Sequence, residues 1–244
     1  NYSQKIFTLK IEIYALRNFT GYIKLEKREA IQKESGWQDT QNEEYLKLIR
    51  YRIENIDLTW VSQFLEIIAR RTKGHGKNLS IKDIGCQTFQ FYKQIKEKNL
   101  PYEYFGYDID RIYVKIGLEY FPELCENVFL ADISNMESLK HTDVSVCSAT
   151  IEHIDDWISS LSKILSSSEK LVIIRTFLGD TTKRETVREV GSKEGYPIWQ
   201  FSFSDFLGCI AGMGWRTRVI RDEFTNSIPI PKSYGMDETA IVRT

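Results

Sequence analysis

The sequence has no excess of charge of either sign. Its 33 Lys and Arg residues stand against 34 Asp and Glu residues, which gives a formal net charge of −1. Non-specific binding to nucleic acid draws most of its affinity from Lys and Arg side chains that neutralise phosphates. The charge balance therefore argues against a nucleic-acid partner.

Residues that form disulfides and metal sites are also scarce. The chain has four Cys and three His, and no two cysteines have the CxxC spacing that is typical of zinc sites. We expect no metal site and four reduced thiols, as is usual in a cytoplasmic protein. Long apolar runs are lacking too, since residues 171–174 fall far short of the roughly 20 residues of a membrane helix. The sequence predicts a cytoplasmic location and no membrane span.

The 244 residues, of which 42% are hydrophobic, suffice for one domain, or for one domain with an extension. Residues 41–55 and 58–71 place apolar side chains three and four positions apart, which predicts two amphipathic helices, the second capped by Asp57. Glycines within residues 73–77 then mark a boundary. We predict an N-terminal helical extension over residues 1–77 and a second domain over residues 78–244.

Strand-like and helix-like segments alternate after this boundary. Strands are predicted at residues 79–84, 102–107, 127–130, 144–147, 171–176, 215–220 and 239–242, and helices at residues 89–98, 111–120, 154–165 and 204–213. This alternation predicts an α/β fold with a doubly wound, mostly parallel, seven-stranded sheet and helices on both faces. Such sheets bind ligands at the carboxyl ends of their strands, so the residues that follow each strand are the candidates for chemistry.

Acidic residues and a glycine follow the first strands. Gly85 leaves the first strand in the run Asp83-Ile84-Gly85-Cys86-Gln87, where a glycine lets the backbone approach a cofactor closely. Asp108 ends the second strand, at about the spacing at which nucleoside-binding sheets place a carboxylate for the ribose hydroxyls. A cap of the following helix is the alternative role for Asp108, and both roles are compatible.

In these segments the sequence resembles the class I S-adenosylmethionine-dependent methyltransferases, with a Rossmann-like fold. Asp83 to Cys86 look like the first motif of the family, Asp108 matches its ribose-binding acid, and Asp132 matches the position that meets the adenine amino group. Residues 147–156 resemble the segment after the fourth strand, in which a Leu-Glu-His or Ile-Glu-His triplet precedes an acidic helix start. The resemblance covers residues 79–244.

The resemblance implies S-adenosylmethionine as the cofactor. It assigns ten cofactor-binding residues: Asp83, Gly85, Cys86, Gln87, Asp108, Ile109, Asp132, Ile133, Ser148 and Ala149. The glycine loop of the family usually reads Gly-x-Gly-x-Gly, whereas this chain has Gln87 and Phe89 at the second and third glycine positions. This departure keeps open a second hypothesis, a catalytically silent binding or assembly module. It weighs against a third, a nicotinamide-dependent dehydrogenase, whose loop needs backbone room for a pyrophosphate.

Methyl transfer to a hydroxyl requires alignment of donor and acceptor and removal of a proton. His153 is the candidate base, because imidazole titrates near neutral pH; a packing role at the start of a helix is the alternative. Residues 177–203 are predicted as a long connection that forms a lid or binding loop. The predicted acceptor-binding residues are Glu152, Arg175, Tyr196, Trp199 and Tyr234.

The segment after the fourth strand reads Ser148-Ala149-Thr150-Ile151. Enzymes of this family that methylate exocyclic amino groups of DNA and RNA carry an Asp/Asn-Pro-Pro-aromatic tetrad there, so its absence again argues against nucleic acid. The helical front end and the Glu-His segment look similar to bacterial enzymes that modify natural products and surface polysaccharides. By this analogy we expect O-methylation, with N-methylation as the alternative, of a small molecule or saccharide, although a fold alone does not fix function.

Overall fold

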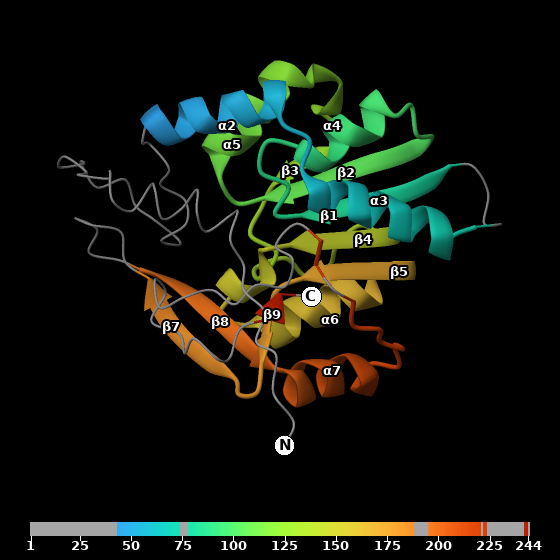
Figure 1. The fold of residues 1–244 in the computed structure, drawn as a ribbon, viewed down its shortest axis with the longest axis vertical. Helices are drawn as coiled ribbons and strands as arrows, with labels where there is room; N and C mark the ends of the chain where they lie inside the picture. Colours follow the sequence, from blue (N-terminus) through green and yellow to red (C-terminus); the bar gives the residue numbers. More distant parts are fainter. Residues whose placement is uncertain (1–42, 74–77, 188–194, 221, 224–241, 244) are drawn as a thin grey trace. The chain divides into compact units, whose positions relative to one another are not determined.

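The computed structural model describes residues 43–73, 78–187, 195–220, 222–223 and 242–243, and Figure 1 draws the remainder as a thin grey trace. The described residues form two compact units. The first unit contains residues 43–151 and 156–174, and the second contains residues 152–155 and the residues from 175 onward. Each unit is described by itself below.

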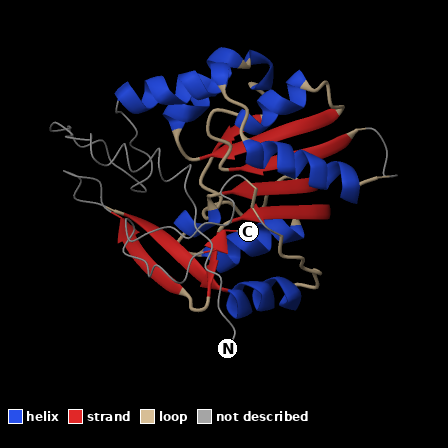
Figure 2. Ribbon diagram, in the orientation of Figure 1, coloured by secondary structure: helices blue, strands red, loops and turns tan. Residues whose placement is uncertain are grey.

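A five-stranded sheet forms the centre of the first unit (Figure 2). Its strands are β1 (Leu79–Ile84), β2 (Tyr102–Asp108), β3 (Val128–Leu130), β4 (Thr142–Ser148) and β5 (Ser168–Arg175), in the order β3-β2-β1-β4-β5. Strand β1 runs parallel to both β2 and β4, and β2 runs parallel to β3. The strand order therefore reverses between β1 and β4, where sheets of this kind bind ligands.

The central strands β1 and β4 are almost wholly buried, as is usual for a parallel sheet covered on both faces. Their buried residues include charged ones, and Lys82 in β1 is fully buried. Its ammonium group donates to the carbonyl oxygens of Lys140 and Ser167, at 2.9 and 2.5 Å, and to the Ser167 hydroxyl at 2.6 Å. Burial lowers the pKa of Lys82 to about 8.

Three helices follow strands of this sheet: α4 (Gln90–Glu97), α5 (Arg111–Tyr120) and α6 (Trp157–Ser166). Two short 3-10 helices, η1 (Pro122–Leu124) and η2 (Ile151–His153), precede β3 and α6. Asp110 caps α5 by accepting from the Ile112 and Tyr113 N–H groups, and Asp156 caps α6 through the Ser159 N–H. The predicted mostly parallel α/β fold is thus confirmed.

The two N-terminal helices, α2 (Glu43–Asn55) and α3 (Thr59–Arg71), form as their periodicity predicts, and they belong to the same compact unit as the five-stranded sheet. The predicted boundary at residue 77 falls among residues 74–77, outside the described residues. Helix α3 packs against α4 through aromatic side chains: the ring centroids of Trp60 and Phe91 are 6.2 Å apart. The predicted Asp57 cap is wrong, since Leu58 occupies the N-cap position without a side-chain bond.

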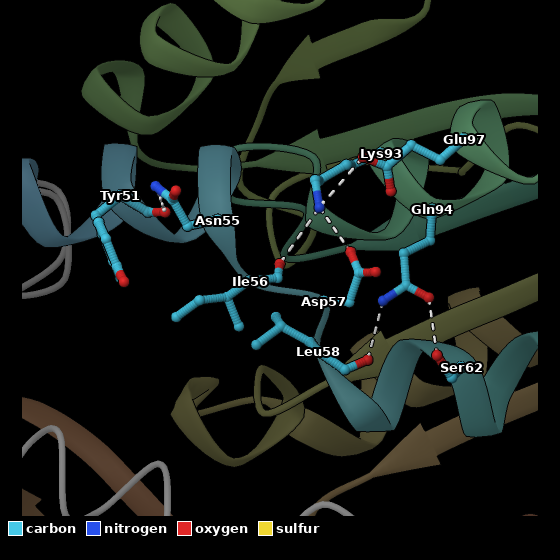
Figure 3. Close-up of polar contacts among 9 residues, drawn as sticks. All are labelled: Tyr51, Asn55, Ile56, Asp57, Leu58, Ser62, Lys93, Gln94 and Glu97. Carbon is cyan, nitrogen blue, oxygen red and sulfur yellow. Dashed lines mark hydrogen bonds and ion pairs between the residues drawn. The ribbon is translucent and has the colours of Figure 1, made fainter.

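Polar side chains of α4 bind the turn between α2 and α3 (Figure 3). Gln94 donates to the Leu58 carbonyl at 3.1 Å and accepts from the Ser62 hydroxyl at 2.9 Å. The Lys93 ammonium pairs with the Asp57 carboxylate at 2.6 Å, which explains why that carboxylate does not cap α3. Because Gln94 is buried, its bonds fix the register of α3 on α4.

The second unit contains a separate four-stranded sheet of β6 (Phe177–Gly179), β7 (Lys183–Val187), β8 (Tyr196–Ser202) and β9 (Val242–Arg243), in the order β7-β8-β6-β9. Strands β7 and β8 are antiparallel, β6 is parallel to β8, and β9 is antiparallel to β6. Helix α7 (Phe203–Gly212) follows β8, and the Ser202 hydroxyl caps it.

This sheet corrects two sequence predictions. Residues 177–203 are not a long connection but form β6, β7 and β8, because residues 183–187 find backbone partners at residues 196–200 that a local pattern does not reveal. Residues 215–220 are not a strand and have no regular secondary structure. Of the predicted strand at 239–242, residues 239–241 lie outside the described residues and Val242 lies in β9. Seven strands in one sheet are therefore not confirmed.

Among the described residues, no helix is both long enough and apolar enough to span a membrane.

We expect Gln94→Ala to lower the free energy of unfolding by about 1–3 kcal/mol, because it removes two hydrogen bonds by which a buried side chain joins α4 to Leu58 and to Ser62 of α3. Lys96→Ala, on the same helix, removes an exposed ion pair with Glu123 and should cost less than about 1 kcal/mol. Urea unfolding of both variants checks this. Equal losses would show that Gln94 does not hold α3 on α4.

Candidate functional site

The turn after β1 has the backbone of a glycine loop. The φ angles of Gly85, Gln87 and Phe89 are +75°, +46° and +66°, so all three residues adopt the left-handed conformation. These are the three glycine positions of the family motif. A non-glycine residue in this region costs about 1–2 kcal/mol, so the fold retains the conformation at Gln87 and Phe89 at an energetic cost.

Gly85 is the position at which no side chain fits. A Cβ atom there would lie 1.9 Å from the Thr150 hydroxyl oxygen and 2.8 Å from its methyl carbon. Thr150 follows β4, so this contact joins the turn after β1 to the turn after β4. Ala149 in the second turn also has a left-handed backbone, with φ +55°.

The Phe89 side chain is accommodated by a glycine on another helix. Its fully buried ring lies against Gly117 of α5, where an added Cβ would lie 2.4–2.7 Å from three ring atoms. The ring that replaces the third glycine of the motif is therefore packed against α5. The sequence contained a signal for this contact, since an isolated glycine in a helix usually has a packing reason.

Asp108 binds the glycine turn directly. One carboxylate oxygen accepts from the Gln87 N–H at 2.7 Å, and the other accepts from the Asp110 N–H at 2.8 Å. Burial raises the pKa of the Asp108 carboxyl to about 6, against these bonds, which lower it. Asp110 and not Asp108 caps α5, so the alternative role of Asp108 as helix cap is wrong.

Asp83 and Cys86 lie in a buried cluster next to this turn. The Tyr104 hydroxyl donates to the Asp83 carboxylate at 2.9 Å. Burial, followed by the nearby charge of Asp108, raises the pKa of the Asp83 carboxyl to about 7, and burial also raises the pKa of the Cys86 thiol. A Cβ at Gly106 would lie 2.8 Å from the Cys86 sulfur. Tyr104 and Gly106, which sequence reasoning missed, thus enclose two predicted site residues.

Asp132 builds the turn after β3. Its carboxylate accepts from the Ser134 N–H at 2.8 Å, the Ser134 hydroxyl at 2.7 Å and the Asn135 amide at 3.1 Å. Lys163 of α6 donates to the Ile133 carbonyl at 3.2 Å and so joins this turn to α6. Ile133 is buried, whereas Asp132 is partly exposed. Ile109, which follows β2, and Ser148, which ends β4, are also partly exposed.

In the second unit, Glu152 contacts the residue before β6, and His153 contacts β8. Glu152 is fully buried and accepts from the Thr176 hydroxyl at 3.0 Å. His153 Nδ1 lies 3.1 Å from the Pro197 carbonyl oxygen, and the His153 ring makes an edge contact with Tyr196 at 5.5 Å. A carbonyl oxygen only accepts, so Nδ1 carries the hydrogen. In the neutral ring, Nε2 therefore holds the lone pair that a base requires.

The other predicted acceptor residues differ in their surroundings. Arg175 is 1% exposed and donates to Asp222 at 3.2 Å, a buried ion pair that sequence reasoning missed. Trp199 is partly exposed and stacks on Phe201, with ring centroids 6.3 Å apart. Tyr234 lies outside the described residues. The roles of these residues in acceptor binding stay predictions.

Among the described residues, no group of three or more His, Cys, Asp or Glu side chains is arranged to hold a metal ion.

No family model and no curated protein matches this sequence. Solved structures do match. An S-adenosylmethionine-dependent methyltransferase from Clostridium acetobutylicum is 14% identical with a TM-score of 0.54, and the match covers 83% of this chain and 98% of that one. DesVI of Streptomyces venezuelae is 12% identical with a TM-score of 0.53, covering 83% and 97%.

A further match is the [4+2]-cyclase SpnF, 15% identical with a TM-score of 0.47, covering 62% of this chain and 56% of that one. The chain thus spans a little over half the length of SpnF. At these identities the likeness concerns the fold, and the chain has the class I methyltransferase fold.

The contact between Phe89 and Gly117 predicts that the effect of Gly117→Ala on the free energy of unfolding depends on the residue at position 89. In the wild-type background, Gly117→Ala should destabilise the protein by about 1–3 kcal/mol, because the new methyl group overlaps the Phe89 ring. In a Phe89→Leu background, which lacks the outer ring atoms, the same change should be neutral or stabilising, as Ala is a better helix former. Urea unfolding of the four proteins measures the coupling; the same cost in both backgrounds would contradict this packing.

The raised pKa of Asp83 predicts a pH dependence of stability. Between its unfolded value of 3.8 and its folded value of about 7, the folded protein binds this proton more tightly than the unfolded chain. The contribution of Asp83 to the free energy of unfolding therefore falls as pH rises from about 4 to about 7, by up to about 4 kcal/mol. Asp83→Asn should flatten the stability curve across this range, as measured by urea unfolding.

Asp143→Asn is the matched control. An ion pair with Lys170 and bonds from Ser80 outweigh burial and lower the pKa of Asp143, so its stabilising contribution is lost only as pH falls through that lowered value. This variant should lower the curve between pH 5 and 7 without changing its slope. A slope in Asp83→Asn equal to that of the wild type would contradict the assignment.

Proposed function

We propose that the protein is an S-adenosylmethionine-dependent methyltransferase that transfers a methyl group to an oxygen of a small molecule or saccharide, with nitrogen as the alternative acceptor atom. One observation carries the proposal: the left-handed turn after β1 binds the Asp108 carboxylate through the Gln87 N–H. This bond brings together the two features by which nucleoside-binding sheets hold a ribose-containing cofactor.

The chemistry of the residues present fits this cofactor. A carboxylate has about four lone-pair sites, so the two oxygens of Asp108 can accept from ribose hydroxyls in addition to the two backbone N–H groups. Phe89 does not fill the turn with its side chain, because its ring is packed against Gly117 of α5. Asp132, which is partly exposed, supplies a carboxylate for the adenine amino group after β3.

The remaining assigned residues would hold the cofactor mainly through the backbone. Gly85, Cys86 and Gln87 form the turn, and Ile109 and Ile133 follow the carboxylates of β2 and β3. Ser148 and Ala149 end β4, where the left-handed Ala149 turns the chain. Asp83, in β1 just before the turn, would support the turn through its bond to Tyr104.

The cofactor would supply a methyl group on a positively charged sulfur. His153 Nε2 would take the proton from the acceptor hydroxyl. The acceptor oxygen would receive the methyl group, and the electron pair of the broken carbon–sulfur bond would stay on sulfur. Alignment of donor and acceptor by the protein would account for much of the rate in such a transfer.

The acceptor residues of the proposal are Glu152, Arg175, Tyr196, Trp199 and Tyr234. Trp199 offers a partly exposed aromatic surface, the kind of surface that packs against the apolar face of a sugar or ring. Glu152 and Arg175 are buried and bonded to Thr176 and Asp222. In this proposal they support the residues of the acceptor site. None of the four cysteines forms a disulfide, which agrees with the proposed cytoplasmic location.

Isothermal titration with S-adenosylmethionine and S-adenosylhomocysteine tests the cofactor, with NAD as the control ligand. We expect micromolar binding of both methyl-donor ligands by the wild type and none of NAD. Asp108→Asn should weaken binding about 10- to 100-fold, because hydrogen bonds to a charged carboxylate are worth about 1.5–3 kcal/mol. Glu123→Gln, the same charge change at an exposed position of the same unit, should bind like the wild type.

Failure of the folded wild type to bind either ligand would overturn the enzyme proposal and favour a silent binding or assembly module. Binding of NAD alone would favour a dehydrogenase. After binding is established, an acceptor screen begins with sugars and small hydroxylated metabolites. His153→Gln should then lower kcat by about 10²- to 10⁴-fold if the ring is the base.

A further inference from the structure

Three side chains of residues 152–155 each bind a different part of the second unit. Glu152 accepts from Thr176, which lies between β5 and β6. His153 bonds to the Pro197 carbonyl on β8, and Asp155 accepts from Arg184 on β7. This short segment is therefore bound by the sheet through His153 and Asp155, and by the residue before β6 through Glu152.

Pro197 supplies the carbonyl oxygen through which strand β8 binds His153. Residues 196–200 of β8 pair with β7, whereas β6 pairs with β8 only at residues 201 and 202. Proline has no N–H to donate to a neighbouring strand, but its carbonyl accepts the ring N–H of His153 at 3.1 Å. Among the described residues, no second strand pairs with residues 196–200 of β8, and the imidazole binds β8 within this stretch. The bond to the Pro197 carbonyl selects the tautomer with hydrogen on Nδ1.

Arg184 makes three contacts at once. Its guanidinium donates to the Asp155 carboxylate at 2.7 Å and to the Thr186 hydroxyl at 3.2 Å, and it lies 5.9 Å from the centre of the Trp199 ring. The ion pair is exposed, so it adds little to overall stability. A planar guanidinium bonded in several directions does fix the geometry of its partners, and Asp155 is only two residues from His153.

We propose that Arg184 is a positioning residue for His153. By holding Asp155 and stacking near Trp199, it keeps residues 152–155 against the β7–β8 pair, so that Nδ1–H stays on the Pro197 carbonyl and Nε2 keeps the lone pair. The catalytic consequence rests on the proposed function, in which His153 is the base. The positioning itself is a property of the folded protein and can be measured without an acceptor.

The experiment measures the ring ¹⁵N chemical shifts of the full chain by NMR. The chain has three histidines, His75, His141 and His153, and His153→Gln identifies the signals of the third. At a pH where the ring is neutral, wild-type His153 should show one tautomer, with a protonated Nδ1 and an unprotonated Nε2.

Arg184→Met removes both hydrogen bonds and the charge, while it keeps an unbranched side chain that reaches about as far as the arginine Nε. We expect the two ring nitrogens of His153 to shift toward each other, as in a mixture of tautomers. Arg184→Lys, which can restore the ion pair with Asp155, should return the shifts part of the way. Arg218→Met, which removes an exposed charge of the same unit outside its sheet, should leave them unchanged.

The dispersion of the amide signals in the same NMR experiments establishes that the Arg184→Met protein is folded. With an acceptor in hand, this variant should lose about tenfold or more in kcat, with little change in the KM for the cofactor. Unchanged His153 shifts in Arg184→Met would overturn the positioning proposal whatever the activity. Shifts that change as expected, together with full activity of His153→Gln, would uphold the positioning and refute the base assigned under the proposed function.

Discussion

The hydrogen bond from the Gln87 N–H to the Asp108 carboxylate is the constraint on which the proposed cofactor site depends. It requires the left-handed backbone of the turn after β1, and that turn in turn requires a glycine at position 85, where Thr150 fills the space of a side chain. The bond joins the ends of β1 and β2, and the Thr150 contact joins β1 to β4. The point at which the strand order reverses is thus defined by backbone geometry together with one buried carboxylate.

The departures from the glycine motif are compensated within the same unit. Phe89 keeps the backbone angle of a glycine, and the volume of its ring is accommodated because α5 has Gly117 and not a larger residue opposite it. A strained residue persists only when its surroundings hold it, and here buried packing on α5 does so. Gln94 and Lys93, one turn further along α4, bind the N-terminal helices (Figure 3). The N-terminal helices therefore support the same helix that the glycine turn begins.

The second unit shows how a polar segment becomes ordered. Residues 183–187 carry charged and hydroxyl side chains, a composition that locally favours a loop, yet they pair with β8 along their whole length. Arg184 on β7 and Pro197 on β8 then bind Asp155 and His153. The acceptor chemistry of the proposal therefore depends on residues more than 30 positions away from His153 in the sequence, as the Pro197 bond shows.

Local pattern determined much of this protein. Alternation of strands and helices gave the parallel α/β fold, helical periodicity gave α2 and α3, and the acid and glycine spacing marked Gly85 and Asp108, because each of these signals is contained within a few neighbouring residues. Tertiary structure alone decided that Asp57 pairs with Lys93, that Arg175 is buried against Asp222, and that residues 177–203 form strands. The physical reason is common to all three: each outcome depends on a partner distant in sequence, whose position exists only after the chain has folded.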